Sequence, residues 1–389
     1  MTNKDLLSPC DLSAKILVQL IMAITQVLLL LFLRNSLTIA LEFRNNGYSD
    51  LVISIHPDVP DDNSSLIIAN IQDLIQSGSL KLFYATEGYA YIKSAIILLP
   101  TTWETSTDTS TTSAYYYQDG DVRINWPNSV YKDTPYTQQP NGCMERGEYI
   151  HLTPNYITLL KNESVEEFGP YANIFVHEWA KLRYGVFEEY GYPGDKQYPL
   201  FYYEEEFING QSDFNLKPNF CTDTEIQGRR EDIVTGGTCN FDDETNLPNA
   251  NCVFKPTGDN SMIRSSLMAA PFLESTEFFC HDYPSELKHD IFKPTKHNAK
   301  CNYLPTWEII RSNVDFQGSD FKPMNTSIPP PITTFAIFKP ETGGKFVLTL
   351  DKSGSMAEKD RMERLKQSSI KWISHDLEEG NQLGIVQFE

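Results

Sequence analysis

Apolar residues follow recognisable spacings along the chain, and each spacing predicts one kind of element. Leu51 to Ile55 and Ala95 to Leu99 are short continuous apolar runs bounded by turn-forming residues, which is typical of buried strands. Between them, apolar residues recur at helical spacing, at Leu66, Ile67, Ile71, Leu74 and Ile75. The order strand, helix, strand predicts an α/β layer near the start of the chain.

Composition divides the remainder into regions. Residues 101–142 are rich in Thr, Ser, Tyr, Asp and Pro, which predicts surface loop, whereas apolar patterns return at Tyr149 to Leu160 and Tyr171 to Phe187. Residues 201–322 hold most of the cysteines among many Asn, Asp and Gly, which indicates a loop-rich region stapled by disulfides. A Pro-rich run then predicts a stiff linker, which we place at residues 323–343.

Beyond the linker the pattern changes back to regular elements. Phe346 to Leu350 is predicted to be a buried strand, Arg361 to Ile373 an amphipathic helix, and Gly384 to Phe388 a second strand. Residues 344–389 therefore look like the opening of another α/β unit.

A long apolar run lies near the N-terminus, from Ile16 to Leu33, with Lys15 before it and Arg34 after it. Such a run predicts a signal peptide or a signal anchor within residues 1–40, with cleavage favoured over anchoring and over a buried core helix. Both targeting alternatives place the rest of the chain in the lumen or outside the cell. Because no second long apolar run follows, we expect contact with the membrane only through an uncleaved N-terminal segment, and no pore built by this chain alone.

The charge balance restricts the partners. The chain carries 32 Lys and Arg against 52 Asp and Glu, a net charge of -20. A surface this acidic repels phosphate backbones, so we expect no nucleic-acid partner.

Cysteines and sequons agree with an oxidising compartment. Six cysteines follow the leader, and their even number predicts disulfides among all of them, with the connectivity left open. These candidates are Cys143, Cys221, Cys239, Cys252, Cys280 and Cys301. None of the six forms a Cys-x-x-Cys pair, so a structural zinc knuckle is not expected. Sequons predict glycosylation at Asn63, Asn162 and Asn325.

One helical segment carries candidate catalytic chemistry. Residues 176–181 read Val-His-Glu-Trp-Ala-Lys. A zinc metallopeptidase helix carries histidines at i and i+4, which puts both imidazoles on one face, and a Glu at i+1 that polarises the zinc-bound water. Here His177 and Glu178 are present, but Lys181 replaces the second His, and its ammonium has no lone pair. Taken alone, the segment is more typical of a solvated helix face, and Glu178 would then pair with Lys181.

A second motif follows the predicted strand Phe346 to Leu350. Asp351, Ser353 and Ser355 form an Asp-x-Ser-x-Ser pattern at the carboxyl end of that strand. Hard oxygen ligands at such a position favour Mg²⁺ or Ca²⁺, the alternative being an ordinary turn with a Ser cap.

Together the two motifs and their surroundings resemble the calcium-activated chloride channel regulator family. The likeness runs from about Leu41 to the last residue. The segments that carry it are Asn45 to Tyr48, Pro57 to Pro60, His151 to Pro154, Val176 to Ala180, Leu182 to Phe187, Thr306 to Arg311 and Asp351 to Met356. The resemblance implies a zincin-like domain with a cysteine-rich part, followed by a von Willebrand factor type A domain. It also implies secreted or membrane-tethered proteins that modulate a chloride conductance without forming the pore, and a protease half that cleaves its own chain.

Carried over residue by residue, the resemblance makes His177 the first zinc ligand and Glu178 the general base. The family's second ligand falls on Lys181 and its third, an Asp, falls on Glu188. Because Lys181 cannot replace an imidazole, we expect zinc to be bound weakly and catalysis to be impaired. Asp351, Ser353 and Ser355 match the metal-ion-dependent adhesion site, whose later ligands this chain does not reach.

These observations predict a fold of the α/β and α+β classes. The expected order is a signal segment at 1–40, a zincin-like domain at 41–200, a cysteine-rich region at 201–322, the linker, and at 344–389 the start of a doubly wound type A domain. Too few residues follow the linker to complete that last domain, so either the chain or its record is truncated.

Three function classes remain open. The first is a secreted or cell-surface regulator of calcium-activated chloride conductance, acting on a chloride channel or another cell-surface protein. The second is an active zinc metallopeptidase that cleaves itself, and the third is a non-functional truncated relative. The first is favoured because the zinc motif is damaged.

Overall fold

The computed structural model describes residues 41–104, 109–112, 115–161, 168–208, 211–282, 288–318, 321–340, 345–377 and 381–388. The predicted leader at 1–40 and the sequon Asn162 lie outside these residues. Within the described ranges, no helix combines the length and the apolar character needed to cross a membrane.

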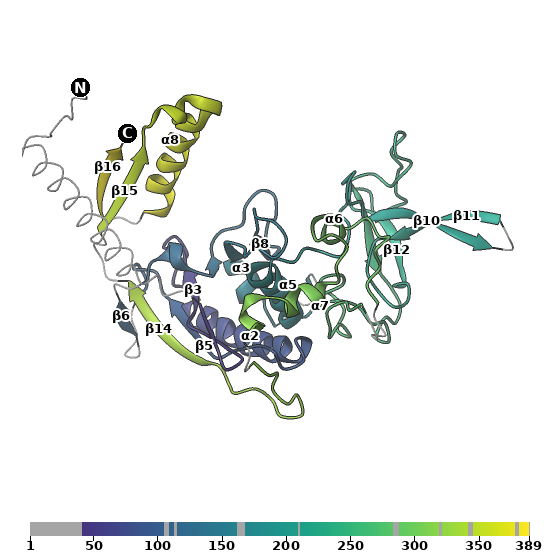
Figure 1. Ribbon diagram of the computed structural model, residues 1–389, viewed down its shortest axis with the longest axis horizontal. Coiled ribbons are helices and arrows are strands. Elements are labelled where there is room, and N and C mark those ends of the chain that lie inside the picture. The colour runs from purple at the N-terminus through teal and green to yellow at the C-terminus, as the bar shows by residue number, and fades with distance from the viewer. Residues whose placement is uncertain are drawn as a thin grey trace, which may run out of the picture. The chain divides into compact units, whose positions relative to one another are not determined.

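Seven strands form the main sheet (Figure 1). Their order across it is β6 (Ser110–Thr112), β14 (Thr334–Pro340), β5 (Ser94–Leu98), β3 (Leu51–Ile55), β7 (Val122–Ile124), β9 (Tyr149–Leu152) and β8 (Tyr136–Gln138). Neighbouring strands are parallel except β8 and β9. Every residue of β3 is buried, as expected for a strand in the middle of a parallel sheet. The strands predicted from the two short apolar runs are therefore confirmed.

The second half of the predicted linker belongs to this sheet. β14 pairs in parallel with β5, with Phe335 opposite Ala95, and it also pairs with β6. The interpretation of 323–343 as a linker is thus wrong for Thr334–Pro340. The Pro-rich composition ends at Pro331, and the apolar residues that follow it can extend a parallel sheet because they have high strand propensity.

Two helices pack against each other beside the sheet, α2 (Ser64–Ala85) and α5 (Tyr171–Tyr184). The helix predicted from spaced apolar residues is confirmed as α2. The helices approach closely at Gly78, where an added Cβ would lie 2.3 Å from the ring of Phe175. Helix α5 ends at Gly185, whose φ of 66° is left-handed and suits a residue without a Cβ.

The rest of the main unit contains short helices, a small sheet and two antiparallel strand pairs. The helices are α3 (Pro154–Thr158), α6 (Lys296–Lys300), α7 (Thr306–Arg311) and the 3₁₀ turns η1 (Tyr117–Asp119) and η2 (Val314–Phe316). A small sheet contains β1 (Glu42–Arg44), β2 (Gly47–Ser49) and β4 (Tyr91–Ile92), and two antiparallel pairs are β10 (Phe201–Ile208) with β11 (Gln211–Pro218) and β12 (Gly228–Asp232) with β13 (Cys252–Pro256). The β10–β11 pair is a hairpin of eight-residue strands and the β12–β13 pair is shorter. Both stand in a region of irregular backbone, which fits the expectation for a cysteine-rich, loop-rich part (Figure 1).

Four of the six cysteines form disulfides. Cys143 pairs with Cys301 and Cys239 pairs with Cys252. Cys221 and Cys280 are buried free thiols, with their sulfurs 2.9 Å apart. The prediction that all six are paired is therefore wrong for these two, because an even count says nothing about which other side chains surround a thiol.

The C-terminal segment consists of β15 (Lys345–Asp351), η3 (Gly354–Asp360), α8 (Arg361–Lys371), η4 (Trp372–Asp376) and β16 (Gln382–Phe388). The two strands pair in parallel, so the predicted strand, helix and strand are confirmed. The expectation that the first strand is buried is wrong: none of the described residues of β15, α8 and β16 is buried. Two strands and one helix cannot cover both faces of such a sheet.

Candidate functional site

Helix α5 carries three candidate residues on its buried side. His177, Glu178 and Lys181 are each less than 10% exposed, at 3%, 4% and 6%. The helix turns by about 100° per residue, so residues i and i+4 share a face, and this brings Lys181 onto the face of His177. The reading of this segment as a solvated helix face is therefore wrong. A buried lysine is unusual and requires a partner.

The partners of Lys181 are two carboxylates. Its Nζ lies 3.0 Å from Oε2 of Glu178 on the same helix and 2.7 Å from Oε1 of Glu188 just beyond it. Oε2 of Glu188 lies 3.6 Å from Nζ of the half-buried Lys296. The ion pair expected between Glu178 and Lys181 is thus present, and Glu188 strengthens it. We call His177, Glu178, Lys181 and Glu188 the lysine cluster.

Within the lysine cluster, Lys181 and Glu188 stabilise each other's charged forms although both side chains are buried. Burial alone lowers the pKa of Lys181, but Glu178 and Glu188 outweigh it and hold that pKa above its ordinary value. Burial raises the pKa of Glu188, but Lys181 and Lys296 reverse the effect and hold it well below the usual range. At neutral pH, Lys181 is therefore an ammonium and Glu188 a carboxylate.

The hydrogen bonds of His177 identify its tautomer. Its Nδ1 lies 2.8 Å from the carbonyl oxygen of Leu267, which can only accept, so Nδ1 carries the proton. Burial lowers the pKa of His177, which keeps the ring neutral. The lone pair of Nε2 is then left on the side of Glu178, whose Oε1 is 3.7 Å away.

These residues do not fit a zinc ion held by the family's three ligands. His177 offers a suitable lone pair, but the second ligand position is a protonated ammonium that has no lone pair to give. The same ammonium contacts the carboxylate of Glu188, the third expected ligand. A divalent cation here would face a positive charge and compete with it for both carboxylates, so no catalytic step through zinc follows from this geometry.

A cleft of about 600 Å³ opens beside the lysine cluster, and His177 and Glu178 form part of its wall. Its other lining is mostly apolar and aromatic, including Ile174, Tyr190, Phe220, Phe254, Pro271 and Phe272. A cleft of this character suits an apolar segment of peptide more than a small charged ligand.

The second motif occupies the end of β15, as predicted. The backbone N–H of Ser353 donates to Oδ1 of Asp351 at 2.7 Å, and the hydroxyl oxygens of Ser353 and Ser355 are 3.1 Å apart. The bond from Ser353 holds the pKa of Asp351 below its ordinary value. Three oxygen donors are thus close together, while binding of Mg²⁺ or Ca²⁺ stays a prediction.

The described sequons are accessible. Asn63 stands at the start of α2 and Asn325 in the segment before β14, and both side chains are exposed. Glycosylation at these positions stays a prediction.

Several contacts of the lysine cluster were absent from the sequence interpretation. Thr137 donates from its hydroxyl to Oε2 of Glu178 at 2.7 Å, and Leu267 and Lys296 contribute the contacts described above. All three lie far from α5 in the sequence, so no local spacing indicates them. Glu189, Cys221, Cys280 and His289 also come together, again from distant segments.

Fold and site together define a disulfide-bonded α/β protein in which a buried His-Glu-x-x-Lys helix lines an apolar cleft. A family model described as "Calcium-activated chloride channel N terminal" matches residues 41–325. The chain belongs to this family of calcium-activated chloride channel regulators.

Two individual relatives support this family assignment. The chain is 35% identical over 364 residues to calcium-activated chloride channel regulator 1 of Equus caballus, covering 92% of this chain and 36% of the relative. It is 34% identical over 370 residues to regulator 4 of Homo sapiens, covering 93% and 37%. The chain thus spans little more than a third of the length of these relatives. No solved structure matches it.

Proposed function

We propose that this chain acts outside the cell or at its surface as a regulator of calcium-activated chloride conductance, without peptidase activity of its own. Lys181 carries the proposal, because its ammonium pairs with both carboxylates on which a zinc peptidase of this kind would depend. The names of the relatives support the regulatory role, and the two disulfides fit an oxidising compartment.

The proposal includes a domain assignment. Residues 41–200 form a zincin-like domain whose helix α5 has lost its metal, and residues 201–322 form its cysteine-rich part. Residues 344–389 form the first strand, helix and strand of a von Willebrand factor type A domain, with Asp351, Ser353 and Ser355 as its share of a Mg²⁺ or Ca²⁺ site. The parallel pairing of β15 and β16 supports this assignment.

The apolar cleft beside α5 gives the regulator a means of action without catalysis. A cleft lined by Tyr190, Phe220, Phe254 and Phe272 can hold an extended apolar segment of a channel or of another cell-surface protein. Glu178, paired with Lys181, then contributes to the shape and charge of the cleft wall instead of activating water.

The test applies secreted chain to cells that carry a calcium-activated chloride conductance and records whole-cell current. The unmodified chain and Glu178→Gln should raise the current to the same extent, and heat-denatured chain should have no effect. Loss of the effect in Glu178→Gln, together with proteolysis by the unmodified chain, would instead establish the peptidase. Failure of the chain to be secreted would favour a non-functional family member.

A matched variant tests why catalysis is absent. Lys181→His restores an imidazole at i+4 from His177 and removes the competing ammonium, so it should increase zinc uptake and permit self-cleavage if Glu188 can reach the metal. Lys181→Gln removes the charge without supplying a metal ligand and is the control. Equal zinc content and equal self-cleavage in the unmodified chain and Lys181→His would contradict the role given to Lys181.

A further inference from the structure

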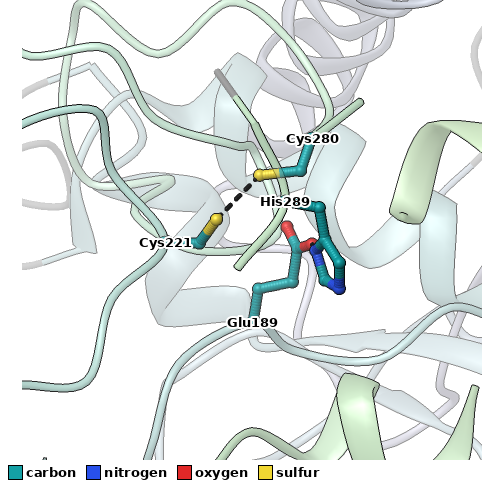
Figure 2. A group of neighbouring side chains, drawn as sticks. All are labelled: Glu189, Cys221, Cys280 and His289. Carbon is teal, nitrogen blue, oxygen red and sulfur yellow. Dashed lines mark hydrogen bonds and ion pairs between the residues drawn. The ribbon is translucent and has the colours of Figure 1, made fainter. Parts of the chain in front are cut away.

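Four potential metal ligands meet at a second buried position, which Figure 2 shows from close by. Glu189, Cys221, Cys280 and His289 each direct one ligand atom into it, and these atoms all lie within 4.8 Å of one another. All four side chains are buried. We call this group the thiol cluster.

The thiol cluster offers two sulfurs, one imidazole nitrogen and one carboxylate oxygen. Zn²⁺ accepts all three kinds of donor and is bound by four protein ligands in structural sites. The sulfurs of Cys221 and Cys280 are 2.9 Å apart, well beyond the ≈2.05 Å of a disulfide bond. Both sulfurs are therefore available as ligands in this arrangement.

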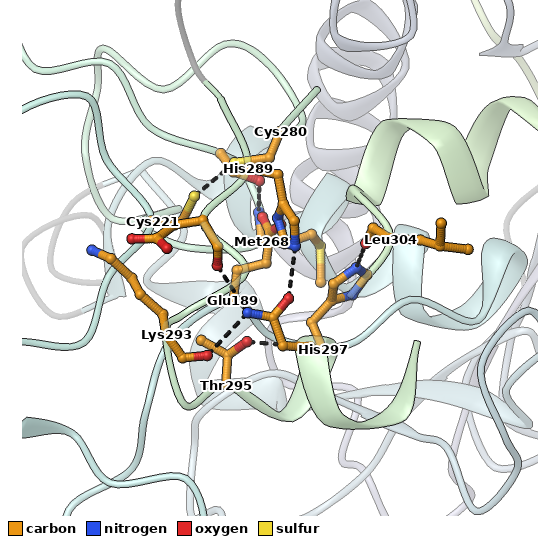
Figure 3. A network of polar contacts seen from close by, with 12 residues as sticks. Glu189, Cys221, Met268, Cys280, His289, Lys293, Thr295, His297 and Leu304 are labelled. Carbon is orange, nitrogen blue, oxygen red and sulfur yellow. Dashed lines mark hydrogen bonds and ion pairs between the residues drawn. The ribbon is translucent and has the colours of Figure 1, made fainter. Parts of the chain in front are cut away.

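Asn298 orients the imidazole of His289, and Figure 3 shows His289 within the polar network around the thiol cluster. The asparagine's Nδ2 donates to the carbonyl oxygens of Asp290 and Lys293, at 2.9 and 3.0 Å, so its Oδ1 is the atom that faces His289. Nε2 of His289 lies 2.6 Å from this oxygen and must carry a proton to donate. In the neutral ring, the lone pair then lies on Nδ1, which faces the cluster. Outer hydrogen bonds of this kind are typical of histidines that bind metals.

The lone pair of Nδ1 has an unfavourable neighbour unless a cation is present. Oε1 of Glu189 lies 3.1 Å from Nδ1, and two lone pairs at that distance repel each other. Oε2 of the same carboxylate has no hydrogen-bond partner, although Glu189 is only 1% exposed. A buried charged oxygen without a partner is unfavourable, because nothing compensates for the water it has lost. A proton on Nδ1 removes the repulsion between Nδ1 and Oε1, but Oε2 still has no hydrogen-bond partner.

We propose that Glu189, Cys221, Cys280 and His289 bind one Zn²⁺ as a closed structural site. The site ties together the segments around Glu189, Cys221 and residues 280–289. It lies next to the lysine cluster, because Glu189 follows Glu188 directly in the sequence. It is independent of the regulatory function and of peptidase chemistry, since it leaves no position open for a substrate.

The test uses the whole chain, secreted from cells and purified without chelator. Elemental analysis should find one zinc per chain. Alkylation without reductant should leave Cys221 and Cys280 unmodified in the native chain and label both after denaturation with chelator. Replacement of the metal by Co²⁺ should add a sulfur-to-cobalt charge-transfer band to the absorption spectrum.

Variants assign the metal to this cluster. Cys280→Ser and His289→Gln should each lower the affinity for added Zn²⁺ at least tenfold, whereas His281→Gln, the matched histidine outside the cluster, and His177→Gln should leave it unchanged. Peptide mapping without reductant that finds Cys221 linked to Cys280 would overturn the proposal. So would a chain without zinc whose two thiols react freely, or zinc that is lost only in His177→Gln. The zinc content and thiol protection of the unmodified chain decide the question even if a variant fails to fold.

Discussion

The lysine cluster and the thiol cluster use two consecutive glutamates in different ways. Glu188 belongs to the lysine cluster, where the ammonium of Lys181 lies 2.7 Å away. Glu189 belongs to the thiol cluster, where one oxygen meets the imidazole of His289 and the other has no partner. Both glutamates are less than 5% exposed. The two clusters therefore place different groups beside a buried carboxylate, an ammonium in the lysine cluster and an imidazole in the thiol cluster.

Lys181 gives the lysine cluster a covalently attached cation that is always present and needs no uptake. The thiol cluster keeps donors without a lysine, and this is the arrangement expected of a site that takes up an ion. Under the two proposals, a site filled by a lysine and a site filled by zinc lie side by side in this chain.

Removal of Lys181 should lower the free energy of unfolding more than any other change considered below. Lys181→Met leaves two buried carboxylates without their ammonium, which should lower the free energy of unfolding by about 3–5 kcal/mol. Denaturant unfolding followed by fluorescence measures the change. Lys296→Met, which removes the more distant and more exposed cation, is the control and should cost about 1 kcal/mol or less. A loss below about 1 kcal/mol for Lys181→Met would show that the lysine cluster does not depend on its cation.

Removal of metal by a chelator should weaken the thiol cluster and leave the lysine cluster unchanged. If the thiol cluster holds zinc, removing the metal should lower the free energy of unfolding by about 3 kcal/mol, which is the linkage expected at roughly 100 times the dissociation constant. The loss should be the same in the unmodified chain and in His177→Gln, and absent in Cys280→Ser. Thermal unfolding with and without chelator makes the measurement. An effect that disappears in His177→Gln would move the metal to the lysine cluster.

Lowering the pH should reduce the stability contributed by the lysine cluster gradually. The pKa of Glu188 is lowered in the folded chain, so its contribution to stability is complete above the unfolded value near 4.5 and is lost as the pH falls below it. A single proton limits the slope to about 1.4 kcal/mol per pH unit. In Lys181→Met, burial without the ammonium raises this pKa, so protonation should relieve the variant. The stability difference between the two chains should therefore shrink between pH 5 and about pH 3, and a constant difference would contradict this account.

Local elements of the fold could be predicted from the sequence because local patterns determine them. The buried strand Leu51–Ile55 and the helix Ser64–Ala85 follow directly from apolar spacing. Strand β14 was missed because the Pro-rich run before it dominated the composition. The exposure of β15 was missed because apolar spacing predicts a face to be covered but cannot tell whether another element covers it.

The contacts of the two clusters also fall into those that local spacing predicts and those that it does not. The pairing of Lys181 with Glu178 could be predicted, since both lie on one helix and their spacing fixes their distance. The contact between His177 and the carbonyl of Leu267 spans 90 residues, and the thiol cluster joins residues from 189 to 289. Sequence spacing does not predict such long-range contacts, because they depend on how the chain folds back on itself. For the same reason, six cysteines could be counted but not paired.

The disulfide between Cys143 and Cys301 closes a ring of the backbone that contains every residue of both clusters. Its two cysteines are 158 residues apart, and every residue from Lys181 to His289 lies between them. A single proteolytic cut within this span, for example in the hairpin of β10 and β11, opens the ring without dividing the molecule. The two pieces stay covalently joined, and the residues of each cluster stay on one linked chain. The ring thus lets this part of the protein survive a proteolytic cut with its internal contacts in place.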